Sequence, residues 1–199
     1  MSPDTLLKRG LALEYVTLFW NVVGTAIVVI AAILAGSVAL AGFGVDSLIE
    51  ILASVVVVWQ LKGTARDRDH HALRLIGLAF FALAIYMFIQ SLRTLVLQLH
   101  PETSPLGIIW LVLTLIAMSL LAWGKYQTGK ALNNPVLQTE AHVTLVDAYL
   151  AGAVLIGLVL NALFGWWWAD PLSGVVIVYY GLREGMHAFH EANLARPLD

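Results

Sequence analysis

Apolar residues in this chain fall into six long stretches with short polar connections between them. An α-helix needs about 20 residues to cross the hydrocarbon core of a bilayer. The six stretches have about this length, and they cover residues 13–34, 38–61, 75–97, 106–123, 140–163 and 171–186. The pattern therefore predicts an all-α, polytopic membrane protein built as a six-transmembrane-helix bundle.

Between these stretches, the segments 62–74, 100–105 and 124–135 are rich in charged and polar residues, Gly and Pro, and we expect them to be loops. None is long enough for a soluble domain, so residues 1–199 are expected to form a single transmembrane domain. The first apolar run is too long for the core of a signal peptide. We therefore expect it to be retained as a helix.

Composition supports a membrane protein: 60% of the residues are hydrophobic and only 12% are charged, and the mean hydropathy is +0.83. A soluble domain has roughly twice this charged fraction. The net charge of -2 gives no reason to expect a nucleic-acid partner. Because there is no Cys, disulfides and thiolate metal ligands are excluded.

Basic residues predict the orientation, because Lys and Arg near the ends of spans favour the cytoplasmic side. If both termini are cytoplasmic, Arg93 is the one basic residue near the outer face, and the tryptophans at 166–168 lie in the outer aromatic belt. A cell membrane is the expected location. The residues placed inside are Lys8, Arg9, Lys62, Arg66, Arg68, Arg74, Lys125, Lys130, Arg183 and Arg196.

Two acidic residues, Asp46 and Glu50, interrupt the second apolar stretch. Residues four apart share one face of a helix, and a charge in hydrocarbon costs at least a few kcal/mol. Such a pair can hold protons or a cation and is therefore a candidate functional site. The alternative is that one acid is neutral and hydrogen-bonded to a neighbouring helix.

The fifth stretch also contains acids. Asp147 lies inside it, and Glu140 is two turns earlier on nearly the same face. Glu140 is alternatively an interfacial charge or an acid favoured by the positive end of the helix dipole. His142 is roughly 140° away from Asp147 around an ideal helix, so an interfacial histidine is the simpler interpretation.

Two other segments are weaker candidates. Asp170 followed by Pro171 is a common helix start. The segment 67–71 (DRDHH) contains residue types that bind divalent metals, or it is a solvated loop. The sequence has no Walker lysine, nucleotide-binding glycine loop or hydrolase motif. We therefore expect neither an enzyme nor a cofactor.

Three segments resemble the transmembrane domain of the cation diffusion facilitator (cation efflux) family. They are 44–54 (GVDSLIEILAS), 140–147 (EAHVTLVD) followed by 153–158 (AVLIGL), and 169–172 (ADPL). The resemblance implies a dimeric antiporter that exports divalent metal ions, often zinc, in exchange for protons by alternating access. It looks like a short branch without the family's cytoplasmic domain, so a homodimer would form through membrane helices.

The resemblance also implies a metal site. The family uses two residues four apart on the second span, matching Asp46 and Glu50, and two on the fifth, matching position 143 and Asp147. This chain departs from the pattern, because Val143 stands where the family usually has His or Asp. Glu140 is the expected substitute ligand, and His142 is one residue out of register.

An all-oxygen site suits harder ions as well as zinc. We expect a divalent cation, zinc first, with manganese, iron or cobalt as alternatives, and protons as the second substrate. Two rival interpretations remain: a non-transporting membrane binding or assembly module with an incomplete site, and a permease for small organic cations that uses the same acids.

Overall fold

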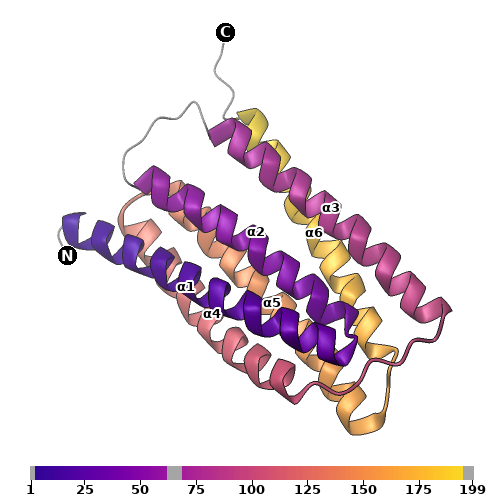
Figure 1. Cartoon of the computed structure of the whole chain (residues 1–199). Coiled ribbons are helices and arrows are strands. Elements are labelled where there is room, and N and C mark those ends of the chain that lie inside the picture. The colour runs from indigo at the N-terminus through magenta and orange to yellow at the C-terminus, as the bar shows by residue number, and fades with distance from the viewer. Residues whose placement is uncertain (1–2, 62–68, 195–199) are drawn as a thin grey trace.

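A computed structural model describes residues 3–61 and 69–194 of the chain. The described residues form six α-helices and no strand, which confirms the predicted all-α class. In chain order the helices are α1 (Pro3–Ala35), α2 (Val38–Leu61), α3 (Asp69–Val96), α4 (Pro105–Ala131), α5 (Pro135–Phe164) and α6 (Ala169–Leu194) (Figure 1).

The main difference from the predicted boundaries is in the segment 124–135, where a loop was expected. That prediction was wrong: α4 continues to Ala131, and only residues 132–134 separate it from α5. Lys125 and Thr128, polar residues that suggested a loop, are buried in the last turns of α4. Polarity was misleading here because these side chains have polar partners inside the bundle. Asn134 then caps α5, its side chain accepting a hydrogen bond from the backbone N–H of Leu137.

The helices are long enough to cross a bilayer. Among the described residues, four segments are both long and apolar enough to do so: Asp4–Ala35, Gly77–Val96, Pro105–Ala131 and Leu137–Phe164. Helices α2 and α6, with 24 and 26 residues, have sufficient length. Large apolar side chains point outward, including Phe19, Ile33 and Leu163, each at least 70% exposed. The chain is a multi-pass membrane protein whose outer surface suits lipid.

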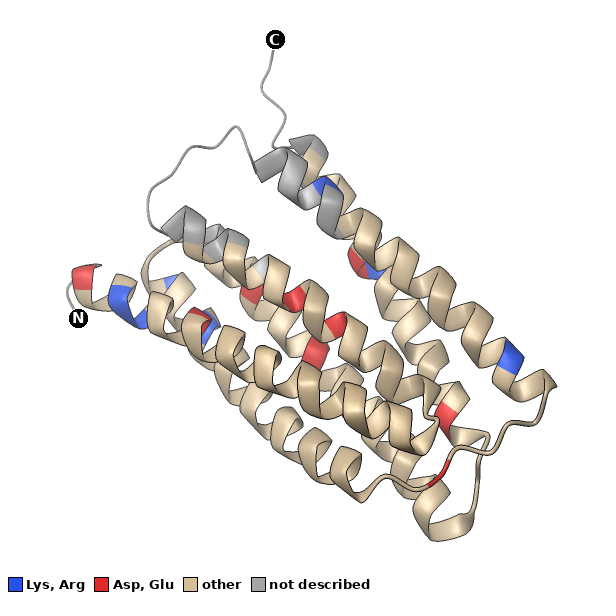
Figure 2. Ribbon diagram, viewed as in Figure 1, with Lys and Arg blue, Asp and Glu red and all other residues tan. Residues whose placement is uncertain are grey.

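The bundle divides into two parts. Helices α1, α2, α4 and α5 pack together, while α3 and α6 run as a pair along one side (Figure 1). The start of α1 and the end of α6 lie at the same end of the bundle, and most of the described Lys and Arg positions are near that end (Figure 2). We call it the inner end, following the expected orientation, and the opposite end the outer end.

Small residues let α3 and α6 approach closely. Gly181 and Gly185 are four residues apart on α6, a spacing typical of close helix pairs in membranes. A Cβ atom at Gly181 would lie 3.3 Å from the carbonyl oxygen of Phe80, and one at Gly185 would lie 3.3 Å from that of Gly77. This tight contact fixes the face of α6 that packs on α3.

At the outer end, Asp170 joins α6 to α2. Its carboxylate accepts hydrogen bonds from the backbone N–H groups of Val38 and Ala39, at 3.1 and 3.4 Å, and from the Ser37 hydroxyl. The sequence suggested that Asp170 caps its own helix. Instead it lies in the first turn of α6 and satisfies N–H groups at the start of α2, which a helix leaves without partners of its own.

Replacing Asp170 with Ala is therefore expected to destabilise the bundle. Removing the carboxylate leaves buried N–H donors without an acceptor, at a cost of about 1–3 kcal/mol. Thermal unfolding of the purified protein in detergent would show a lower midpoint, with a smaller decrease for Asp170→Asn, which keeps one acceptor. An Asp170→Ala midpoint equal to that of the unchanged protein would contradict this role.

Candidate metal centre

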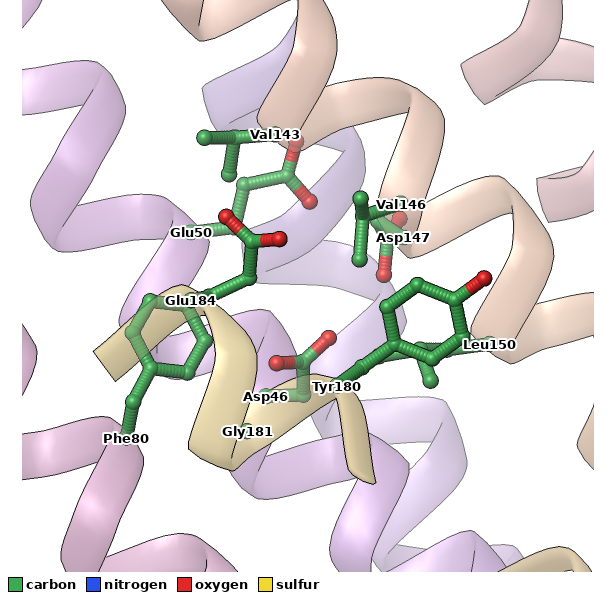
Figure 3. A pocket seen from close by; sticks show the side chains of 10 residues that line it. All are labelled: Asp46, Glu50, Phe80, Val143, Val146, Asp147, Leu150, Tyr180, Gly181 and Glu184. Atoms are coloured by element: carbon green, nitrogen blue, oxygen red, sulfur yellow. The ribbon is translucent and has the colours of Figure 1, made fainter. Parts of the chain in front are cut away.

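A small cavity lies where α2 and α5 face the pair of α3 and α6. Its volume is about 10 Å³, counted as space open to the centre of a water molecule. That is close to the smallest space that holds one water. The lining residues are Asp46 and Glu50 from α2, Phe80 from α3, Val143, Val146, Asp147 and Leu150 from α5, and Tyr180, Gly181 and Glu184 from α6 (Figure 3).

The structure brings together Asp46, Glu50 and Asp147, three of the acids predicted from the sequence. Their exposed fractions are 5%, 2% and 2%, and their carboxylates point into the space between the helices (Figure 3). In the described structure, neither oxygen of Glu50 or Asp147 accepts a hydrogen bond from a donor of another residue, and the two carboxyls can bond to each other only through a proton that one of them carries. A buried carboxylate without a partner is costly unless it holds a proton or a cation. The cavity is therefore chemically suited to exchange one for the other.

The structure places Glu140, the expected fourth ligand, outside the cavity lining. One oxygen of its carboxylate lies 3.3 Å from Nζ of Lys125 and accepts a hydrogen bond of 3.1 Å from the Ser54 hydroxyl. Nζ of Lys125 also lies 3.0 Å from the Glu14 carboxylate and donates to the Thr144 hydroxyl at 3.0 Å. Glu140 thus belongs to an ion triad with Glu14 and Lys125.

Other predicted residues are also away from the cavity. His142 is exposed on α5 and is not among the lining residues. Val143 does line the cavity, so the position expected to hold a ligand contributes an apolar side chain. The candidate cluster at 67–71 falls outside the described residues at positions 67 and 68, and the side chains at 69–71 are likewise not described.

Comparison with known proteins identifies the family. The family described as the cation efflux transmembrane domain matches residues 74–194, which is more than half of the chain. This chain belongs to the cation efflux family. The match covers α5 and α6 with their cavity residues, in agreement with the resemblance read from the sequence motifs.

The individual relatives have low sequence identity to this chain. Transmembrane protein 163 of Xenopus laevis is 26% identical over 151 residues, covering 71% of this chain and 54% of the relative. The cation-efflux pump FieF of Shewanella oneidensis is 29% identical over 156 residues, covering 73% and 52%. A cadmium, cobalt and zinc/H(+)-K(+) antiporter of Bacillus subtilis is 23% identical over 110 residues, covering 55% and 35%. The chain spans about half the length of the first two.

Three buried charged residues were not predicted as such from the sequence. Glu184 on α6 is 4% exposed and lines the cavity; an acid inside the last predicted span was the available signal. Lys125 is fully buried although the pattern placed it in a loop. Glu14 is fully buried as well. Their pairing depends on helices distant in sequence, so no local pattern reveals it.

The acids line the cavity without converging on a single point. Within residues 3–61 and 69–194, no group of three or more acidic or histidine side chains is arranged to hold a metal ion. Like charges oppose their own convergence, and the charges of Glu50 and Asp46 both act on Asp147. A cation would have to draw these side chains together, which rotation of Glu and Asp side chains allows.

Removing the lysine from the ion triad should be strongly destabilising. Lys125→Met leaves the buried carboxylates of Glu14 and Glu140 without their cation, and breaking a buried pair in this way costs about 3–5 kcal/mol. Unfolding in detergent should show this loss for Lys125→Met. The triple variant that adds Glu14→Gln and Glu140→Gln should recover most of the stability; equal losses in both proteins would rule out the triad as a charge-paired unit.

Proposed function

We propose that this chain is a secondary transporter that exports a divalent metal cation, zinc first, in exchange for protons. The observation that carries the proposal is the buried cavity lined by Asp46, Glu50 and Asp147, in which Glu50 and Asp147 have no described hydrogen-bond partner. Membership of the cation efflux family and relatives named as a cation-efflux pump and a cadmium, cobalt and zinc antiporter support metal as the substrate.

The exchange follows from carboxylate chemistry. A carboxylate binds a metal only after losing its proton, so metal binding releases protons and protonation releases the metal. One set of side chains can then hold either substrate, and access from alternate sides couples their movements. The small cavity suits an ion or a single water better than an organic cation. No catalytic step is required.

The donor atoms bear on the identity of the metal. Asp46, Glu50 and Asp147 offer only oxygen, which suits manganese and other hard ions as well as zinc. Zinc stands first because the Bacillus relative is named for zinc, cadmium and cobalt, with manganese, iron and cobalt as alternatives.

We also propose a homodimer formed through the membrane helices, on the family resemblance alone.

Neutralising the cavity acids tests the transport site. Asp46→Asn and Asp147→Asn should each lower metal uptake into proteoliposomes by at least tenfold, because each removes a charged oxygen donor from a buried site. Glu102→Gln, which changes an exposed acid in the connection between α3 and α4, is the matched control and should transport normally. Unaltered uptake by both cavity variants would refute the site, and absence of metal-stimulated flux in the unchanged protein would favour the non-transporting module.

A pH gradient should drive the metal. Protonated carboxyl groups do not bind the cation, so acid on the side of metal entry should slow uptake and acid on the opposite side should accelerate it. The measurement uses proteoliposomes with a metal-sensitive and a pH-sensitive dye inside. Inward metal movement should make the interior less acidic as protons leave. Uptake that is independent of the gradient, with no proton movement, would argue against exchange.

A further inference from the structure

Glu184 occupies an unusual place for an acid. It lies on α6, 4% exposed, and lines the same cavity as the acids of α2 and α5. Figure 3 shows its carboxylate turned into the space that the carboxylates of Asp46, Glu50 and Asp147 also face. The contact of Gly181 and Gly185 with α3 holds α6 in place, so this orientation is set by helix packing.

No ion pair among the described residues explains why Glu184 is buried. Its charge acts on Asp46, a like charge in the same cavity. Both ion pairs found among the described residues belong to Lys125, and neither includes Glu184. The adjacent Arg183 is exposed. A buried acid that faces other acids destabilises the protein unless a proton or a cation compensates it.

The cavity also lacks a ligand at one position. Val143, one turn before Asp147 on α5, contributes only methyl groups to the lining. Glu140 does not fill this gap, because it is paired with Lys125 and Ser54 outside the lining. Among the described lining residues, the carboxylate that remains besides Asp46, Glu50 and Asp147 is that of Glu184.

We propose that Glu184 is a fourth carboxylate ligand of the transported cation and sets its preference toward oxygen-seeking divalent ions. This inference rests on the proposed transport function. The ligand that α5 lacks at Val143 is supplied from α6 instead. Four carboxylates and no imidazole make a donor set that favours manganese relative to zinc, compared with a site that contains histidine.

The origin of this ligand has a mechanical consequence. Asp46, Glu50 and Asp147 come from the part of the bundle that contains α1, α2, α4 and α5, whereas Glu184 belongs to the pair of α3 and α6. A cation held by all four acids therefore ties the two parts together. Protonation of the acids releases the cation and so removes this link. Cation binding therefore controls how strongly the pair of α3 and α6 is attached to the other four helices.

The experiment compares binding and proteoliposome uptake of Mn²⁺ and Zn²⁺ by the full chain. Glu184→Gln should weaken binding of both ions by at least tenfold, because it removes one charged ligand. Glu184→His should retain Zn²⁺ binding and lose Mn²⁺ binding, raising the zinc-to-manganese affinity ratio by at least tenfold. The double variant Val143→Asp/Glu184→Gln, which returns a carboxylate from α5, should recover binding. Size-exclusion profiles and thermal midpoints confirm that each variant is folded.

The outcomes separate this inference from the transport proposal. If Glu184→Gln and Glu184→His bind and transport both ions as Glu102→Gln does, while Asp46→Asn and Asp147→Asn abolish uptake, Glu184 is not a ligand and the transport function stands. If Asp46→Asn and Asp147→Asn also transport normally, the transport site itself is wrong. Should Glu184→Gln be too unstable to purify, the change in ion preference of Glu184→His decides the question.

Discussion

A carboxylate removed from water needs a hydrogen-bond donor, a cation or a proton, and this requirement organises the bundle. The buried acids fall into groups according to how this requirement is satisfied. Asp170 takes the N–H groups at the start of α2, and Glu14 and Glu140 share Lys125. Glu50 and Asp147 have no described partner and face the cavity with Asp46 and Glu184. Only these cavity acids are left to bind a cation or proton reversibly.

The satisfied acids hold the frame around the cavity. The triad connects α1, α4 and α5, while Asp170 connects the outer ends of α2 and α6. The described residues also form an apolar core that includes Phe43, Leu111 and Leu150. Because the low dielectric strengthens paired charges and penalises unpaired ones, the same apolar surroundings that stabilise the triad keep the cavity acids ready to take a cation or proton.

The sequence supported most of the fold because hydrocarbon leaves few choices for a backbone: each span must satisfy its own hydrogen bonds as a helix. The bounds of α2 were predicted correctly. The inner ends of α4 and α5 were not, since Lys125 and its neighbours appear polar locally but are buried against partners from α1 and α5. Helical periodicity likewise brought Asp46 and Glu50 to one face, and the placement of Asp147 in the same cavity agreed with the family motifs.

What the sequence determined by itself is the set of six helices, the membrane environment and the acids of α2 and α5, because length, hydropathy and spacing of four are local properties. Tertiary structure decided which charges meet. It assigned Glu140 to Lys125, Asp170 to the start of α2, and Glu184 to the cavity beside Val143. These pairings join residues from different helices. Glycines four apart on α6 mark a face that can pack closely, but no single span shows which helix packs there, and the contact with α3 had to come from the tertiary structure.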